Sequence, residues 1–181
     1  MFCAKLSTIC LIALSLLLTA CNEDLNPSSS DKRAAVQAGS LGNQVGQIAS
    51  DFSILDTEQN LLTLSEELVT YDAVVLYFTM WCPLCDSHMS SIRESIKPDY
   101  PNIHFINIDY VSGSVEQARA NQVSSGYRSE TVLADPAHRL TEQFKGDMGV
   151  TLVINSDSLI LMNEGFKHAK LIDALDLASQ P

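Results

Sequence analysis

One segment near the middle of the chain restricts the possible folds more than any other. A continuous run of apolar, strand-forming residues, Ala73 to Phe78, is followed shortly by Trp81-Cys82-Pro83-Leu84-Cys85. Such a run, without alternating polar residues, is typical of a β-strand that is buried on both faces. A helical stretch follows up to about Lys97, and Pro98 is expected to end it. The segment therefore predicts a strand that leads directly into a helix, with the cysteines at the junction.

The remainder of the chain beyond about residue 45 alternates strand and helix patterns. Ser65 is expected to cap a short helix that starts at Glu66. Strands are expected over 51–56, 60–64, 103–109, 132–133, 150–154 and 159–162, and helices over 115–121, 137–144 and 169–178. This order predicts an α/β fold in which a central mixed β-sheet is flanked by helices.

The junction between strand and helix predicts redox chemistry. The N-terminus of a helix presents unpaired N–H groups and a partial positive charge, which favour a thiolate at Cys82. Pro83 falls in the first helical turn, where its missing N–H costs nothing. The spacing lets Cys85 attack a mixed disulfide formed by Cys82. Cys82 is therefore the expected nucleophile and Cys85 the expected resolving thiol.

The first 44 residues predict export and a lipid anchor. Residues 1–20 form a signal peptide, with Lys5 before an apolar stretch too short to span a bilayer. The signal ends in Leu18-Thr19-Ala20-Cys21, which resembles the lipobox of bacterial lipoproteins and implies lipidation of Cys21. Asn22 after the cysteine favours the outer membrane over the inner one. Residues 21–44 are then the lipidated cysteine and a flexible tether, and residues 45–181 the folded domain.

The charge of the chain excludes one class of partner. There are 22 acidic residues against 11 Lys and Arg, which gives a formal net charge of −11. Proteins that bind nucleic acids neutralise phosphates with basic residues, so no nucleic-acid partner is expected. Hydrophobic residues make up 46% of the chain, which is enough for a packed core.

The folded domain resembles the thioredoxin superfamily, and in particular the exported TlpA/ResA type and related redoxin domains. The likeness rests on Asp51-Phe52, on the segment from Phe78 to Cys85, and on Val150-Thr151-Leu152-Val153-Ile154-Asn155. It implies a thioredoxin-like fold, an extracytoplasmic thiol–disulfide oxidoreductase without a cofactor, and exported protein thiols and disulfides as partners. A reductase would draw electrons from a membrane thiol transporter. The implied site residues are Cys82 and Cys85, with Trp81, Pro83, Val150 and Thr151 as neighbours.

Three positions depart from the family pattern. The family has a cis-proline opposite the dithiol, where this chain has Val150, or Gly149 under a one-residue shift. It usually has Glu three residues after the second cysteine and a proline farther along, where this chain has His88 and Ser90. The Pro-x-x-x-Thr-x-x-Cys motif of peroxiredoxins is also absent, because Val75 stands seven residues before Cys82. Activity of the usual peroxiredoxin kind is therefore not expected.

Two alternatives to catalysis remain open. Cys85, His88 and Met89 share one face of the expected helix near Cys82, and this set of sulfur and imidazole ligands suits Cu(I). The domain would then bind or deliver copper. Alternatively, the domain is a binding module that has lost efficient exchange. The other histidines are expected to have structural roles (His104, His138 and His168).

Overall fold

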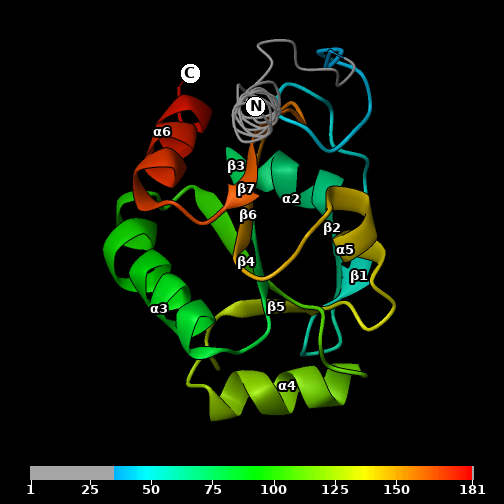
Figure 1. The fold of residues 1–181 in the computed structure, drawn as a ribbon, viewed down its shortest axis with the longest axis vertical. Helices are drawn as coiled ribbons and strands as arrows, with labels where there is room; N and C mark the ends of the chain where they lie inside the picture. The colour runs from blue at the N-terminus through cyan, green and yellow to red at the C-terminus, as the bar shows by residue number, and fades with distance from the viewer. Residues whose placement is uncertain (1–34, 181) are drawn as a thin grey trace, which may run out of the picture. The chain divides into compact units, whose positions relative to one another are not determined.

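The computed structural model describes residues 35–180, in which one five-stranded sheet forms the centre (Figure 1). The predicted signal peptide, Cys21 and most of the predicted tether lie outside the described residues. The strand order is β5-β4-β3-β6-β7, and β3, β4 and β5 run parallel while β6 and β7 are antiparallel to their neighbours. The strands are β3 (Ala73–Thr79), β4 (Ile103–Asp109), β5 (Thr131–Ala134), β6 (Val150–Asn155) and β7 (Ile160–Gly165).

Helices cover both faces of this sheet. In Figure 1, α3 (Pro83–Ser91) and α6 (His168–Ala178) lie on one face, and α2 (Leu64–Thr70) and α5 (Arg139–Phe144) on the other. Alternate residues of β3 enter the two cores, because successive side chains of a strand point to opposite faces. The remaining elements are the hairpin of β1 (Ser53–Leu55) and β2 (Leu61–Thr63), and helix α4 (Val115–Ser124).

The structure confirms the predicted fold class, an α/β fold with a mixed central sheet flanked by helices, and corrects two local predictions. Ser65 does not cap α2, because the helix begins at Leu64 and the Ser65 hydroxyl donates to Asp51 Oδ2 at 2.7 Å. The helix that follows the cysteines is not uniform. After α3 the backbone continues as a π-helix over Ile92–Ile96 and a 3₁₀ turn over Lys97–Asp99.

Residues 36–44, which the sequence places in the tether, belong to the same compact unit as the domain. Asn163 donates to the carbonyl of Asn43 at 2.6 Å, and Asn43 donates to the carbonyl of Gln143 at 3.1 Å. The folded unit therefore begins earlier than residue 45. Within the described residues, no helix is long and apolar enough to cross a membrane.

Segments that precede β3 also hydrogen bond to both outer strands of the sheet. At β7, Gly46 donates to the carbonyl of Ile160 at 2.9 Å, and Ile160 donates back to Gln47 at 2.9 Å. At β5, Thr57 donates to the carbonyl of Val132 at 2.9 Å. Part of the backbone of each outer strand is therefore satisfied by the chain's own N-terminal residues.

Gly146 lies between α5 and β6 against the fully buried ring of Phe78. A Cβ at this position would lie 2.2 Å from the ring, inside van der Waals contact. We expect Gly146→Ala to lower the free energy of unfolding by about 2 kcal/mol, because the core ring has to move. Urea unfolding measures this, with Gly165→Ala as the control, because a Cβ there meets no atom within 4 Å. Equal losses in the two variants would contradict the prediction.

Candidate active site

The turn between β3 and α3 presents Cys82 at the start of a helix. Cys82 is the N-cap of α3, and its sulfur accepts a hydrogen bond from the Cys85 N–H at 3.1 Å. Pro83 is the first helical residue, where no intrahelical partner for its nitrogen is needed. The sulfur of Cys82 therefore lies among the free N–H groups of the helix end, which stabilise a thiolate.

The two cysteines differ in their access to solvent. Both are free thiols in the structure, and Cys82 is half-buried whereas Cys85 is fully buried. Burial raises the pKa of the Cys85 thiol, but hydrogen bonds from the Cys82 thiol and from the backbone of Met80 and Cys82 lower it by more. The net direction is a pKa below the ordinary thiol value. An outside reactant can reach Cys82 first, and Cys85 can ionise beside it.

Trp81 holds the turn in an uncommon conformation. Its φ is +59°, a left-handed value that costs a non-glycine residue about 1–3 kcal/mol. The indole Nε1 donates to Asp109 Oδ2 at 2.7 Å, and the backbone N–H donates to the Thr79 hydroxyl at 3.1 Å. Asp109 is fully buried and also accepts from the backbone of Val111 and Ser112 and from the Ser112 hydroxyl. This carboxylate therefore fixes the residue that precedes the nucleophile.

Met148 contacts the nucleophile from the loop before β6. Its thioether sulfur lies 3.5 Å from Cys82 Sγ, and its side chain is exposed. Beside the cysteine, a cavity of about 400 Å³ is lined by Trp81, Cys82, Pro83, Asp86, Met89 and Ser125. Cys82 therefore contacts the Met148 thioether and also lines an open cavity from which another sulfur can approach it.

The loop before β6 carries the positions at which the resemblance implied a cis-proline. Residues 35–180 contain no cis peptide bond, and Gly149 has a φ of +79°. Gly149 donates to the carbonyl of Phe78 at 2.9 Å, which joins this loop to the end of β3. Val150 is half-buried against the core, and Thr151 is fully buried with its hydroxyl 3.3 Å from the Gly149 carbonyl. The backbone of Gly149 therefore holds the start of β6 against the end of β3, the strand that leads to the cysteines.

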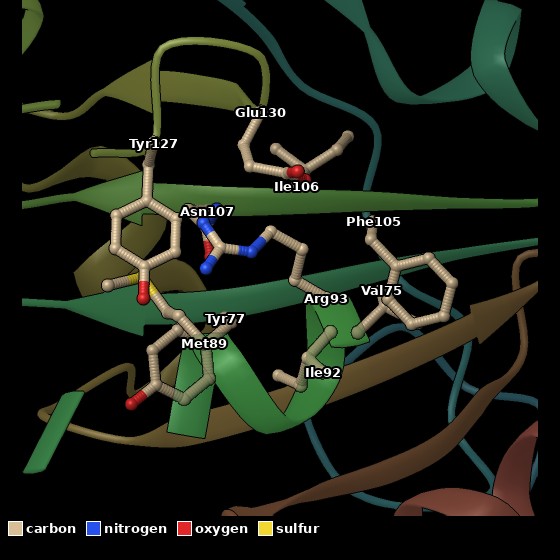
Figure 2. A pocket seen from close by; sticks show the side chains of 10 residues that line it. All are labelled: Val75, Tyr77, Met89, Ile92, Arg93, Phe105, Ile106, Asn107, Tyr127 and Glu130. Carbon is tan, nitrogen blue, oxygen red and sulfur yellow. The ribbon is translucent and has the colours of Figure 1, made fainter. Parts of the chain in front are cut away.

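The structure places His88 and Met89, two of the ligands of the copper alternative, in surroundings that differ from each other. The Nδ1 of His88 lies 3.0 Å from the Tyr77 hydroxyl, and its ring stacks on Phe166. Met89 is buried in the core, and Figure 2 shows its thioether between the rings of Tyr77 and Tyr127. Among the described residues, no three or more His, Cys, Asp or Glu side chains form a group that could hold a metal ion.

Sequence reasoning missed three of the residues that shape this site. Met148 stands in a loop without a recognisable pattern, and Tyr77 has the appearance of an ordinary core residue within the apolar run. Asp109 stands at the end of a predicted strand, and this position is the only feature of the sequence that could have indicated its place in the site. Residues at the carboxyl ends of neighbouring parallel strands lie at the same edge of the sheet, and Thr79 pairs with Asp109 there.

Solved structures share this fold. No protein-family model and no curated protein sequence matches the chain. A candidate protein disulfide isomerase from Bacteroides thetaiotaomicron is 22% identical with a TM-score of 0.61, over 74% of this chain and 87% of that one. The C-terminal domain of a candidate thiol-disulfide oxidoreductase from the same organism is 14% identical with a TM-score of 0.63, over 75% and 96%. Peroxidoxin BcpB from Mycobacterium tuberculosis is 20% identical with a TM-score of 0.56, over 72% and 93%. The predicted thioredoxin-like fold is therefore confirmed.

Proposed function

We propose that this protein is an extracytoplasmic thiol–disulfide oxidoreductase that reduces disulfides of exported proteins through Cys82 and Cys85. The observation that carries the proposal is the arrangement of the two thiols. The half-buried sulfur of Cys82 caps α3, and the buried Cys85 follows one helical turn later with its N–H on that sulfur. The solved structures of the same fold include candidate disulfide exchange proteins, which supports the proposal.

The reaction needs only these two thiols. The Cys82 thiolate attacks one sulfur of the partner's disulfide, a new S–S bond forms, and the partner's other sulfur leaves as a thiolate. Cys85 then attacks the Cys82 sulfur, the bond to the partner breaks, and the partner's second sulfur leaves as a thiolate. The partner gains two electrons, and the protein holds a Cys82–Cys85 disulfide. A membrane thiol transporter is the proposed donor that reduces it again.

The proposed location follows from the sequence before the folded unit. Lipidation at Cys21 would anchor the chain on the periplasmic side of a membrane, with the outer membrane favoured by Asn22. Mass analysis of the mature N-terminus tests this step. A chain that begins at Cys21 and carries acyl groups supports the anchor, and an unprocessed N-terminus contradicts it.

Trapping of partners tests the exchange reaction. In Cys85→Ser the first attack is retained and the second is lost, so mixed disulfides through Cys82 should accumulate. Cells that express this variant are lysed in acid, and the complexes are separated without reductant and identified by mass spectrometry. Cys82→Ser is the matched control and should trap nothing. Equal trapping by the two variants would overturn the assignment of Cys82 as the nucleophile.

The equilibrium reduction potential of the pair tests the direction of transfer. A value near that of thioredoxin, about −270 mV, fits a reductase, whereas a value near about −120 mV would identify an oxidant and overturn the reductase assignment. Reaction with hydrogen peroxide is the companion measurement. Rapid oxidation of Cys82 by peroxide would contradict the prediction that the protein is not a typical peroxiredoxin.

A further inference from the structure

The cavity of about 400 Å³ beside Cys82 carries a charge of its own. Cys82 lines this cavity, so a partner whose sulfur approaches from it brings the residues that flank its cysteine into the cavity. Of the described residues that line it, Asp86 is the only acidic one, and none is basic. A preference for the charge of a partner at this place therefore depends on Asp86.

A hydrogen bond holds the Asp86 carboxylate in place. The Tyr127 hydroxyl donates to Asp86 Oδ1 at 2.7 Å, and Tyr127 is fully buried. The hydroxyls of Ser90 and Tyr127 lie 3.0 Å apart, and the Arg93 guanidinium lies over the Tyr127 ring at 4.8 Å from its centroid (Figure 2). The residue that orients Asp86 is therefore itself fixed, and the carboxylate is preorganised at the cavity.

No basic side chain of the described residues pairs with the Asp86 carboxylate. None of the ion pairs within residues 35–180 includes Asp86, and no hydrogen bond within this range uses its Oδ2 atom. Arg93 packs on Tyr127, but its guanidinium pairs with Glu94 at 2.9 Å. The Asp86 side chain is also exposed. One carboxylate oxygen is therefore available to a cation from outside.

The other walls of the cavity suit the stem of a long basic side chain. Trp81 and Met89 line it, and the Trp81 indole is held by its hydrogen bond to Asp109 at 2.7 Å. Lysine and arginine carry a charged head on an apolar stem that packs on apolar surface. A cation over the face of an indole ring is also attracted to it. Apolar walls and one anchored carboxylate together match a basic side chain.

We propose that this cavity is a subsite for a basic side chain next to the attacked cysteine of a partner, an inference that rests on the proposed function. The charged head of the lysine or arginine binds Asp86 Oδ2, while the stem lies along Trp81. The protein then favours disulfides that basic residues flank, and like-charge repulsion disfavours disulfides that acidic residues flank. The exchange steps at Cys82 and Cys85 are unchanged, because the subsite acts on how the partner binds before them.

Peptides that differ only in the charge beside the cysteine test the subsite. The substrates are disulfide-linked dimers of Gly-X-Cys-X-Gly, in which X is Arg, Gln or Glu. The second-order rate of their reduction by the reduced, full protein is divided by the rate of the same peptide with dithiothreitol, which removes the intrinsic effect of X. We expect the corrected rate for Arg to exceed that for Gln about 3- to 5-fold, and that for Glu about 10-fold or more.

Asp86→Asn separates the charge from the structure. The amide oxygen of asparagine can still accept from Tyr127, so this variant removes the charge and keeps the hydrogen bond. We expect its Arg-to-Glu ratio to fall below about threefold, and we expect Asp86→Lys to reverse the order of the two peptides. A change in the reactivity of Cys82 itself would alter all three rates by the same factor and leave the ratio as it was.

Asp173→Asn is the matched control, because it removes the same charge from an exposed side chain on α6. It should keep the full preference for Arg, since the net charge of the chain does not produce that preference. Equal corrected rates for the three peptides, or a ratio that Asp86→Asn leaves intact, would overturn the subsite while exchange stands. Failure of the unchanged protein to reduce any of the peptides would instead overturn the proposed function, and the subsite with it.

Discussion

Cys82→Ser is expected to lose at least about 10³-fold in the rate of disulfide reduction, because the attacking atom is removed. A serine hydroxyl is not ionised at neutral pH, and the hydrogen bond from the Cys85 N–H cannot replace a thiolate. The buried Cys85 cannot substitute, since a partner's disulfide does not reach it. The measurement is the rate at which the reduced protein opens a disulfide in a model peptide, followed by chromatography.

Thermal unfolding of Cys82→Ser supplies the control for this loss. The N-cap role should be preserved, because a serine oxygen can accept the same N–H, so stability should change by less than about 1 kcal/mol. A folded but inactive variant supports the assignment of Cys82 as the nucleophile. A variant that keeps a tenth or more of the rate would show that another group attacks the disulfide.

Asp109→Ala is expected to lower the free energy of unfolding by about 3 kcal/mol or more. The carboxylate accepts from the Trp81 indole, from two backbone N–H groups and from the Ser112 hydroxyl, and each buried donor left without a partner costs about 1–3 kcal/mol. Urea denaturation gives the value. Asp173→Ala, which removes an exposed carboxylate on α6, should change stability by less than about 0.5 kcal/mol.

The same substitution should also disturb the site. Trp81 is the only tryptophan of the chain, so its fluorescence reports the environment of the turn directly. Loss of the Asp109 partner frees the indole and the left-handed backbone of Trp81, and we expect slower attack by Cys82 together with a shifted emission maximum. Unchanged emission and unchanged stability would show that Asp109 does not hold the turn.

The fold could be predicted because its signals are local. The apolar run of β3, the cysteine pair and the alternation of strands and helices each lie within a few consecutive residues, and the structure confirms the resulting architecture. The cap was predicted two positions too late, because Thr63 is the N-cap of α2 and Ser65 bonds to Asp51 instead. Competition from a residue 14 positions away is not visible in a local pattern.

The candidate site could be predicted only in part for the same reason. The spacing of the cysteines is visible in the sequence. The contacts of Asp109, Met148 and Tyr77 are not, because they depend on how β3, β4 and the loop before β6 pack together. Tyr77 pairs with Asn107 and Thr151 in the sheet, and nothing in a run of apolar residues distinguishes its hydroxyl as a partner of His88.

The hydrogen bonds that Gly46, Gln47 and Thr57 make to the outer strands reduce the tendency of the sheet to pair with other chains. An open strand edge is a template on which a second chain can add, and this leads to aggregation. Here β5 and β7 each have part of that template occupied by the preceding chain. Under the proposed function, the partners would be partially oxidised chains with exposed strands. The outer strands of this sheet offer such chains fewer free backbone groups to pair with.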